Sequence, residues 1–443
     1  MSFKEFRYGS LDELIEESAS LGLDLHFSVN LKVLGKKATI QGHTVPNSMA
    51  IHPMEGSDGN PDGSPGELTV RRYDRFSRGG AGLIWFEAVA VVPEGKAVSR
   101  QLRMDEHNLP EFQRLLEKMT QNAHREFGNN FDPLYIVQLT HSGRFSKPEG
   151  VSAPIIACKN PYFEERFKNE NIAHVIRDDE LEALEDKYVE TAVLAHKAGF
   201  HGVDIKACHR YLLSELLSAY TREGKYGGDF EGRTRFLLNA VDKIKSRLGS
   251  SFMVASRLNI YDGIPYPNGW GVDKEDYRSY DLTEPIRLVK LLYDKGVRLV
   301  NLTMGTPYYN PHVNRPYDKG GYVPDEHPLR GVARLVKGVG EVQKACPDMA
   351  VVGTGYSWLR QFSPHLGAGS LEKGLATLIG FGREAFAYPD FARDILTHGA
   401  LDRRKCCITC GKCAEILRAG GTTGCVVRDP EIYVPAYREF CGS

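Results

Sequence analysis

The sequence predicts an α/β protein, a (β/α)8 TIM barrel with an N-terminal cap and a C-terminal cysteine-rich iron–sulfur tail. Short apolar segments alternate with amphipathic segments of helical period, which produces parallel strands joined by helical crossovers. The alternation repeats eight times in roughly 350 residues, as a barrel requires. No expected strand is followed by the G-x-G-x-x-G fingerprint of an open dinucleotide-binding sheet.

The expected strands are short apolar runs close to turn residues. They are Ser48–His52, Gly82–Ala90, Leu134–Leu139, Gly202–Lys206, Phe252–Leu258, Leu299–Met304, Ala350–Gly353 and Ala376–Phe381. Helices are expected between most of them. One covers Asp179–Ala198 with Asp178 as its cap, and another ends at Gly249.

Three regions follow from this pattern. Residues 1–45 form the cap, with a short helix near Leu11–Ser20 and a hairpin over residues 31–42 that turns at Gly35. Residues 46–398 form the barrel, and residues 399–443 form the tail. Long loops rich in Gly, Pro, Tyr and Asn, at 259–280 and 306–327, are expected to wall the active site, because they follow strand ends.

The composition excludes several classes of protein. Lys and Arg number 56 and Asp and Glu 57, for a net charge of −1, which argues against a broad basic surface for nucleic acid or anionic lipid. No apolar run approaches the roughly 18 residues that cross a bilayer. The N-terminus, MSFKEFRYGSLDEL, has no signal-peptide pattern, so a cytoplasmic location is expected.

Polar residues cluster just after the fourth expected strand. Lys206, His209 and Tyr211 lie in one short segment, where each can donate a proton or bind an oxyanion at the barrel mouth. The alternative is that His209 and Tyr211 are loop residues with ordinary hydrogen bonds. The position at a strand end weakens this alternative.

Two further polar residues lie inside apolar strands. A buried amide such as Gln138 needs hydrogen-bond partners, and Arg257 stays charged when buried. Both residues suggest a bound polar, electron-rich group. The alternative for Arg257 is an ion pair with a nearby carboxylate such as Glu87.

The last two strands end in glycines. Gly355 follows the seventh strand, and Gly382 and Arg383 follow the eighth, where Arg383 begins a helix. Accessible backbone N–H groups at glycines, a helix N-terminus and an arginine together form a phosphate-binding site. In this fold, phosphate sites commonly lie after strands seven and eight.

The tail concentrates the cysteines. Of nine, five fall between residues 406 and 425. The spacing C-x2-C-x2-C with a distant fourth thiol favours a [4Fe–4S] cluster on Cys407, Cys410, Cys413 and Cys425. Structural zinc and free thiols remain alternatives.

The segment HGVDIKACHRYLLSELLSAYTREG resembles the fourth-strand signature of the Old Yellow Enzyme family of FMN-dependent oxidoreductases. NSMAIHPME, FEAVAV, VQLTHSGR, SRLN and FGRE match in the family's order, over about residues 41–398. The tail resembles the iron–sulfur branch, typified by 2,4-dienoyl-CoA reductase and trimethylamine dehydrogenase. That branch often adds nucleotide-binding domains, for which we find no fingerprint here.

The resemblance implies FMN in the barrel mouth of residues 46–398. It assigns Pro53, Met54, Glu55 and Ala88 to the isoalloxazine ring. It assigns Gln138 and Arg257 to the pyrimidine edge of that ring. The residues that it assigns to the phosphate are Gly305, Gly355, Gly382 and Arg383.

The implied reaction is reduction of the C=C bond of an α,β-unsaturated carbonyl compound. Hydride passes from FMN N5 to the β-carbon, His209 and Lys206 polarise the carbonyl, and Tyr211 protonates the α-carbon. Lys206 stands where many relatives have His or Asn. Electrons are expected from NAD(P)H, or from a protein partner through the cluster. The oligomeric state stays open.

Three alternatives remain. The same scaffold could oxidise an amine or a C–H bond and pass electrons out through the cluster. Lys206 could act as a Schiff-base nucleophile in a lyase. The protein could also be a binding protein without enzymatic activity, in which the tail is stabilised by a structural zinc ion.

Overall fold

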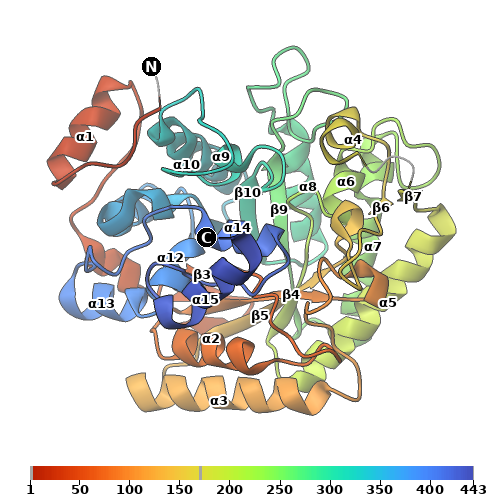
Figure 1. Ribbon diagram of the computed structural model, residues 1–443, viewed down its shortest axis with the longest axis horizontal. Helices are drawn as coiled ribbons and strands as arrows, with labels where there is room; N and C mark the ends of the chain where they lie inside the picture. Colours follow the sequence, from red (N-terminus) through yellow and green to blue (C-terminus); the bar gives the residue numbers. More distant parts are fainter. Residues whose placement is uncertain (1–2, 169–171, 443) are drawn as a thin grey trace.

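The computed structural model describes residues 3–168 and 172–442, and its centre is a closed barrel of eight parallel strands (Figure 1). In chain order the strands are β3 (Met49–Ile51), β4 (Leu83–Ala90), β5 (Leu134–Thr140), β8 (Gly202–Ile205), β9 (Met253–Tyr261), β10 (Leu299–Met304), β11 (Ala350–Gly353) and β12 (Leu378–Phe381). Around the barrel the order is β10-β11-β12-β3-β4-β5-β8-β9. Each strand falls on a predicted segment, so the predicted TIM barrel is confirmed.

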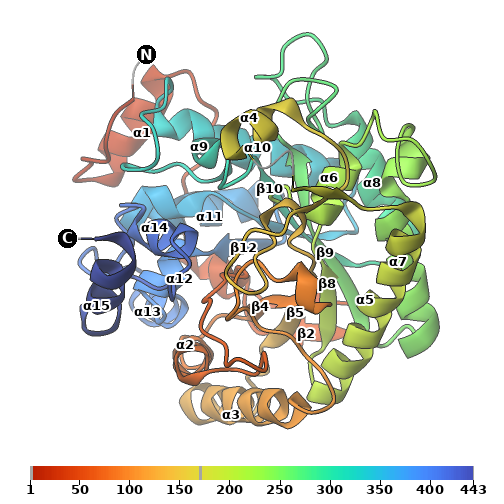
Figure 2. The same cartoon turned by 45° about the vertical axis from the view of Figure 1, so that its right-hand side comes forward.

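Helices connect successive strands and cover the outside of the barrel (Figure 2). They are α2 (Glu67–Ser77), α3 (Leu109–Phe127), α5 (Asp178–Ala198), α7 (Phe230–Leu248), α8 (Thr283–Asp294), α10 (Pro328–Ala345), α11 (Ser363–Glu372) and, after β12, α12 (Arg383–Ala387) and α13 (Phe391–His398). The predicted cap of α5 is wrong by one residue. Arg177 is the N-cap, and its backbone N–H donates to Glu180 Oε2 at 2.8 Å.

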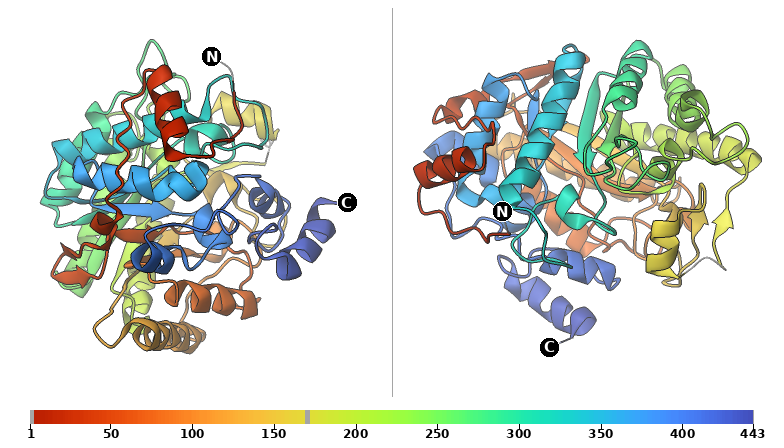
Figure 3. Two further views of the ribbon diagram at one scale, coloured as in Figure 1. Left: turned by 90° about the vertical axis from the view of Figure 1, so that its left-hand side faces the viewer. Right: turned by 90° about the horizontal axis from the view of Figure 1, so that it is seen from above.

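The N-terminal region closes the bottom of the barrel. Helix α1 (Leu11–Ser20) lies where predicted, and the chain then descends along one side of the barrel (Figure 3). The predicted hairpin is shifted: residues Leu31–Gly35 form a 3-10 helix, η1, and the strands are β1 (Ala38–Ile40) and β2 (His43–Val45). The turn lies at Gln41 and Gly42, with φ of 47° and 85°.

Burial explains this shift. Leu31, Val33 and Leu34 are all buried, which an alternating strand with one solvated face would not allow. Ile40 and Val45, from β1 and β2, pack on the cluster of apolar side chains that fills the lower barrel. The cap is therefore part of the core.

Loops and short elements surround the opposite, carboxyl-terminal rim. They comprise η2 (Pro93–Gly95), η3 (Gly143–Phe145), β6 (Ile155–Ile156), α4 (Pro161–Phe167), β7 (His174–Val175), α6 (Leu212–Leu217), α9 (Pro311–Asn314) and η4 (Tyr356–Phe362). The tail adds α14 (Lys412–Arg418) and α15 (Pro430–Cys441), which pack together beside α12 (Figure 2). Among the described helices, none has the length and apolar character needed to span a bilayer.

A buried ion pair holds the rim loops after β5. Arg144 Nε lies 2.6 Å from Glu215 Oε1, and both side chains are completely buried. Glu215 also accepts a hydrogen bond from the backbone N–H of Ala157, and Arg144 donates to the carbonyl of Cys158. The pair thereby ties η3, β6 and α6 into one unit.

We predict that Arg144→Met destabilises the protein by about 3–5 kcal/mol, because it leaves the Glu215 carboxylate buried without its partner. Urea unfolding followed by tryptophan fluorescence measures the change. Arg114→Met, which breaks the exposed pair with Glu111, should cost less than about 1 kcal/mol. Equal losses in the two variants would contradict this role for the buried pair.

Candidate functional site

One large cavity opens at the carboxyl ends of the strands. Its volume is about 1090 Å³ with the solvent space at its mouth included, comparable to cofactor sites in general. Residues of β5, β9, β10 and β12, and residues directly after β3, β8 and β11, form its walls together with α14 of the tail. The predicted residues that line it are Pro53, Met54, Glu55, Gln138, Lys206, His209, Tyr211, Arg257, Gly355, Gly382 and Arg383.

Two predicted residues lie outside this cavity. Ala88 is fully buried in β4, paired with Gln138 of β5, and its carbonyl accepts a hydrogen bond from Gln101. Gly305 packs against α9, where a Cβ would come within 2.9 Å of the backbone nitrogen of Asn314. Neither residue is among those that line the cavity.

A buried carboxylate that sequence reasoning missed organises one side of the cavity. Asp204 of β8 accepts hydrogen bonds from Trp85 Nε1 at 2.8 Å, Gln138 Nε2 at 2.6 Å and the backbone N–H of Arg257 at 2.5 Å. Burial raises the pKa of Asp204 to about 6. Since Asp204 holds the amide nitrogen of Gln138, the amide oxygen is left as an acceptor for a ligand. The signal in the sequence was a single acid inside an apolar strand.

Arg257 forms no ion pair within the described residues. Its Nη1 donates to the carbonyl of Pro53 at 3.3 Å, and its Nε is buried without a partner. The proposed alternative partner, Glu87, pairs instead with Arg72 at 2.5 Å, so that alternative is wrong. The guanidinium is therefore available to an electron-rich ligand.

Glu55 links the predicted catalytic residues. Lys206 Nζ lies 2.8 Å from Glu55 Oε1 and 3.7 Å from the centre of the Tyr211 ring. The Tyr211 hydroxyl lies 3.3 Å from both Glu55 oxygens and 3.0 Å from the hydroxyl of Tyr308. Burial, then Glu55 and Tyr308, raise the pKa of Tyr211 well above its usual value. The hydroxyl therefore keeps its proton at neutral pH.

His209 occupies a strained turn. Both it and Arg210 have φ of 62°, in the left-handed region, which costs about 1–3 kcal/mol per residue. A fully buried ion pair between Arg210 and Asp262, at 2.9 Å, holds the turn. Burial, with Arg257 and Lys206, lowers the pKa of His209 well below its usual value, so the imidazole is neutral.

The tautomer of His209 follows from its neighbour. Asn314 Nδ2 lies 3.0 Å from His209 Nε2 and also contacts the oxygens of Thr303 and Met304. An amide nitrogen among such acceptors donates, so Nε2 accepts and the ring proton lies on Nδ1. Asn314 therefore fixes which nitrogen of His209 can donate.

Arginines gather where the phosphate was predicted. Arg315, Arg383 and Arg418 all line the cavity, and none of them forms an ion pair in the described part of the chain. Burial and the neighbouring Arg383 lower the pKa of Arg315 to about 10. A Cβ on Gly382 would lie 2.9 Å from Sδ of the flexible Met54 side chain, so glycine gives this wall the most room.

This donor set fits FMN. The free guanidinium of Arg257 and the amide oxygen of Gln138 suit the polar pyrimidine edge. The uncompensated arginines and the glycine wall suit a phosphate. Arg315, Arg418 and Tyr308 were not predicted, because they come from a loop and a tail helix that only the tertiary fold brings to the cavity.

The four predicted ligand cysteines line a second cavity of about 370 Å³. Cys407, Cys410, Cys413 and Cys425 reach it, whereas Cys406 and Cys441 do not. Within the described residues, no three His, Cys, Asp or Glu side chains are placed to hold a single metal ion. The thiols are free, and backbone N–H groups donate to the sulfurs of Cys407 and Cys425 at 3.4 Å. Four thiols around one cavity suit a cluster, which is larger than a single ion.

Comparison with known proteins supports this description. A sequence profile of the NADH:flavin oxidoreductase / NADH oxidase family matches residues 37–301. NADH oxidase of Thermoanaerobacter brockii is 29% identical over 269 residues, 58% of this chain and 37% of that protein. Cinnamate reductase of Clostridium sporogenes is 27% identical over 409 residues, 89% of this chain and 57% of that protein.

The fold comparison agrees. The structure of a 2-naphthoyl-CoA reductase complexed with 2-naphthoyl-CoA superposes with a TM-score of 0.70 at 19% identity, covering 92% of this chain and 58% of that one. This chain thus spans less than two thirds of each of these three proteins.

The matched profile runs from the N-terminal hairpin into β10 and covers more than half of the chain. It includes Glu55, Gln138, Lys206, Tyr211 and Arg257. The chain belongs to the NADH:flavin oxidoreductase / NADH oxidase family, in agreement with its resemblance to the Old Yellow Enzyme family.

Proposed function

We propose that this enzyme reduces the C=C bond of an α,β-unsaturated carbonyl compound with bound FMN, and that its tail carries a [4Fe–4S] cluster. One observation carries the proposal. The proton-bearing hydroxyl of Tyr211 and the neutral imidazole of His209 line the same cavity as Gln138 and Arg257.

FMN would be held by residues already described. Gln138 and Arg257 would bind the pyrimidine edge, and Gly355, Gly382 and Arg383 the phosphate. When bound and reduced, FMN supplies the hydride for the substrate β-carbon. The protein contributes binding, orientation and proton transfer.

His209 and Lys206 would bind the substrate carbonyl. The Nδ1–H of His209 is a neutral donor whose orientation Asn314 fixes. Lys206 gives one hydrogen bond to Glu55 and has further N–H groups for the carbonyl oxygen. Both donors favour the oxyanion that develops when the β-carbon is reduced.

Tyr211 would protonate the α-carbon. Its hydroxyl is protonated across the neutral range because burial and Glu55 raise its pKa. The Tyr308 ring stacks on Phe145, with ring centres 3.7 Å apart, and forms an apolar wall of the cavity next to Tyr211. A planar conjugated acyl compound suits this wall, and similarity to a cinnamate reductase points to the same substrate class.

The neighbouring cavities support one of two candidate electron sources. Cys413, Arg383 and Phe386 line both the large cavity and the cysteine cavity. A cluster there would adjoin the flavin and could receive electrons from a partner protein. NAD(P)H is the other candidate donor, consistent with the NADH oxidase relative.

The other functions considered have less support. Lys206 is bound by Glu55 and is not a free amine for Schiff-base formation. Amine oxidation would use the same cofactors in the opposite direction. Anaerobic mixing distinguishes the two: amines would bleach oxidised flavin, whereas cinnamate or enones would restore the colour of reduced flavin.

We predict that Tyr211→Phe lowers alkene turnover by about 100-fold or more while flavin reduction persists, because only the protonation step loses its acid. Stopped-flow absorbance separates the two half-reactions. Tyr188→Phe removes a buried hydroxyl of α5 outside the cavity and should behave as wild type. Undiminished turnover of Tyr211→Phe would remove Tyr211 from the mechanism.

We predict that Arg383→Met weakens FMN binding by about 10- to 100-fold but leaves riboflavin binding unchanged, because a charged hydrogen bond contributes about 1.5–3 kcal/mol and riboflavin has no phosphate. Fluorescence quenching of flavin titrated with apoprotein gives both constants. Arg114→Met, on the exterior of α3, is the control. An equal loss for both flavins would show that Arg383 does not bind the phosphate.

We predict about four iron and four sulfide ions per chain after anaerobic purification, as a [4Fe–4S] cluster requires. Cys413→Ser should lose most of both, whereas Cys441→Ser, outside the cysteine cavity, should keep them. Iron, sulfide and zinc analysis provides the measurement. Zinc without iron in the wild type would replace the cluster by a structural zinc site.

A further inference from the structure

Glu55 occupies an unusual position among the residues that line the cavity. It contacts both the nearest ammonium group and the hydroxyl of the proposed acid, Tyr211. Its side chain is 13% exposed and that of Lys206 only 4%. Glu55 follows β3, Lys206 follows β8 and Tyr211 caps α6, so three separate elements place these groups together.

Few other charged or titratable groups face this cluster. Tyr308, from the loop after β10, contacts the Tyr211 hydroxyl, and Arg257 of β9 interacts electrostatically with Glu55. Cys208, which follows β8, has a buried thiol that also interacts electrostatically with Glu55. Among these, only Lys206 carries an N–H proton in direct contact with the Glu55 carboxylate.

Once Tyr211 has donated its proton, the tyrosinate that remains is energetically unfavourable. A tyrosinate at this position would be buried 3.3 Å from the Glu55 carboxylate, and two adjacent negative charges repel strongly in a poorly hydrated site. A replacement proton must therefore arrive as the hydroxyl proton leaves. The Tyr308 hydroxyl is nearer, at 3.0 Å, but it carries no positive charge. The hydrogen-bonded path from Tyr211 to a cation runs through Glu55 to Lys206, with steps of 3.3 and 2.8 Å.

We propose that Glu55 relays a proton from Lys206 to Tyr211 during reduction, an inference that rests on the proposed function. The Tyr211 O–H bond breaks as the C–H bond forms on the substrate α-carbon. A proton passes from Lys206 Nζ to one Glu55 oxygen while the carboxyl group delivers a proton to Tyr211 Oη. Glu55 is a carboxylate before and after, Lys206 ends as a neutral amine, and water reprotonates it when product leaves. No electrons move in these transfers.

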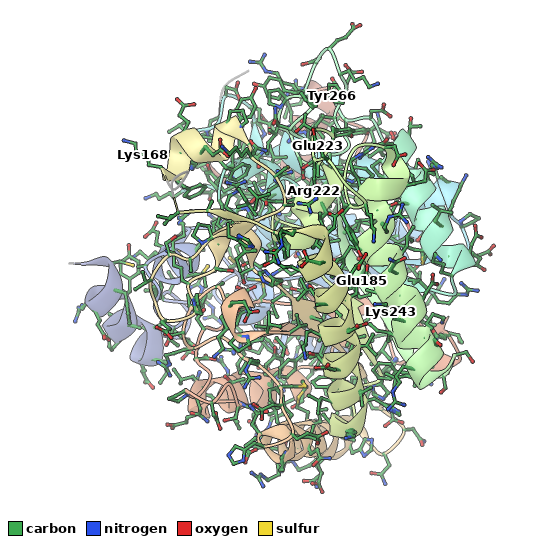
Figure 4. The ribbon with its side chains drawn as sticks, turned by 90° about the vertical axis from the view of Figure 1, so that its right-hand side faces the viewer. Lys168, Glu185, Arg222, Glu223, Lys243 and Tyr266 are labelled. Atoms are coloured by element: carbon green, nitrogen blue, oxygen red, sulfur yellow. The ribbon has the colours of Figure 1, made fainter. Side chains whose placement is uncertain are left out.

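The chain contains a matched triad that cannot perform this task. Glu185 of α5 accepts a hydrogen bond from the Tyr226 hydroxyl at 2.8 Å and pairs with Lys243 of α7 at 3.1 Å. Figure 4 shows Glu185 and Lys243 together on the outer helices. The residue types are the same, but none of the three lines the catalytic cavity. Glu185→Gln is therefore a control with the same chemical change.

The test compares Glu55→Gln, Tyr211→Phe and the double variant, each loaded with FMN. The measurement is the anaerobic rate at which cinnamate, or an enone, oxidises the reduced flavin. Gln cannot pass a proton, so Glu55→Gln should slow alkene reduction by about 10- to 100-fold. In the Tyr211→Phe background the same change should cost nothing more, because Glu55 acts through Tyr211. Lys206→Met should lose at least as much activity as Glu55→Gln, because it removes both the proton source and a donor to the substrate carbonyl, and Glu185→Gln should match wild type.

A second readout does not depend on turnover. In protein labelled at tyrosine Cζ, the carbon NMR signal lost in Tyr211→Phe reports the ionisation of Tyr211. Glu55→Gln should lower the pKa of Tyr211, because a neighbouring negative charge raises it. Glu185→Gln should leave that signal unchanged.

The outcomes separate the two hypotheses. A wild type that reduces neither substrate overturns the proposed function and the relay together. An active wild type with an equally active Glu55→Gln, or losses that add fully in the double variant, overturns the relay alone. An unmoved Tyr211 titration in Glu55→Gln also overturns it, since the two groups would then not be coupled.

Discussion

The burial of charge at the barrel rim is the constraint on which the site depends. A parallel barrel brings the carboxyl ends of its strands to one rim, so polar side chains there share a confined space with little water. Asp204 shows how the chain satisfies this. Its carboxylate accepts from Trp85, Gln138 and the backbone of Arg257, and so joins β4, β5, β8 and β9. The same contacts orient the side chain of Gln138 toward a ligand.

The balance of charge differs among the groups lining the cavity. Lys206 is neutralised by Glu55, and Arg72 by Asp58 and Glu87 behind it. Arg257 and Arg315 have no such partners in the described chain, and burial lowers the pKa of both. Glu55 thus neutralises the cation beside Tyr211, whereas Arg257 and Arg315 are unpaired elsewhere in the described cavity lining. An anionic cofactor would complete this balance.

The sequence predicted the parts of the structure that depend on local pattern. All eight strands could be located because apolar runs report burial directly, and β9 differs mainly in extending to Tyr261. The hairpin was misplaced because Gly35 and Gly42 are equivalent as turn residues until the lower core selects which side chains are buried. The contact of Glu55 with Lys206 joins residues 151 positions apart, and no local pattern encodes it. For the same reason the sequence could not predict that Arg315 and α14 line the cavity.

The two Glu–Lys–Tyr triads show why residue type alone could not have identified the site. Glu185 of α5 accepts a hydrogen bond from Tyr226 and pairs with Lys243 of α7, whose side chain is 39% exposed. Around Glu55 it is the lysine that differs, because the side chain of Lys206 is only 4% exposed. In the proposed relay, this enclosure of Lys206 at the strand ends directs its proton to Glu55, whereas Lys243 is open to solvent. The two triads therefore differ in where the barrel places common side chains and not in the types of those side chains.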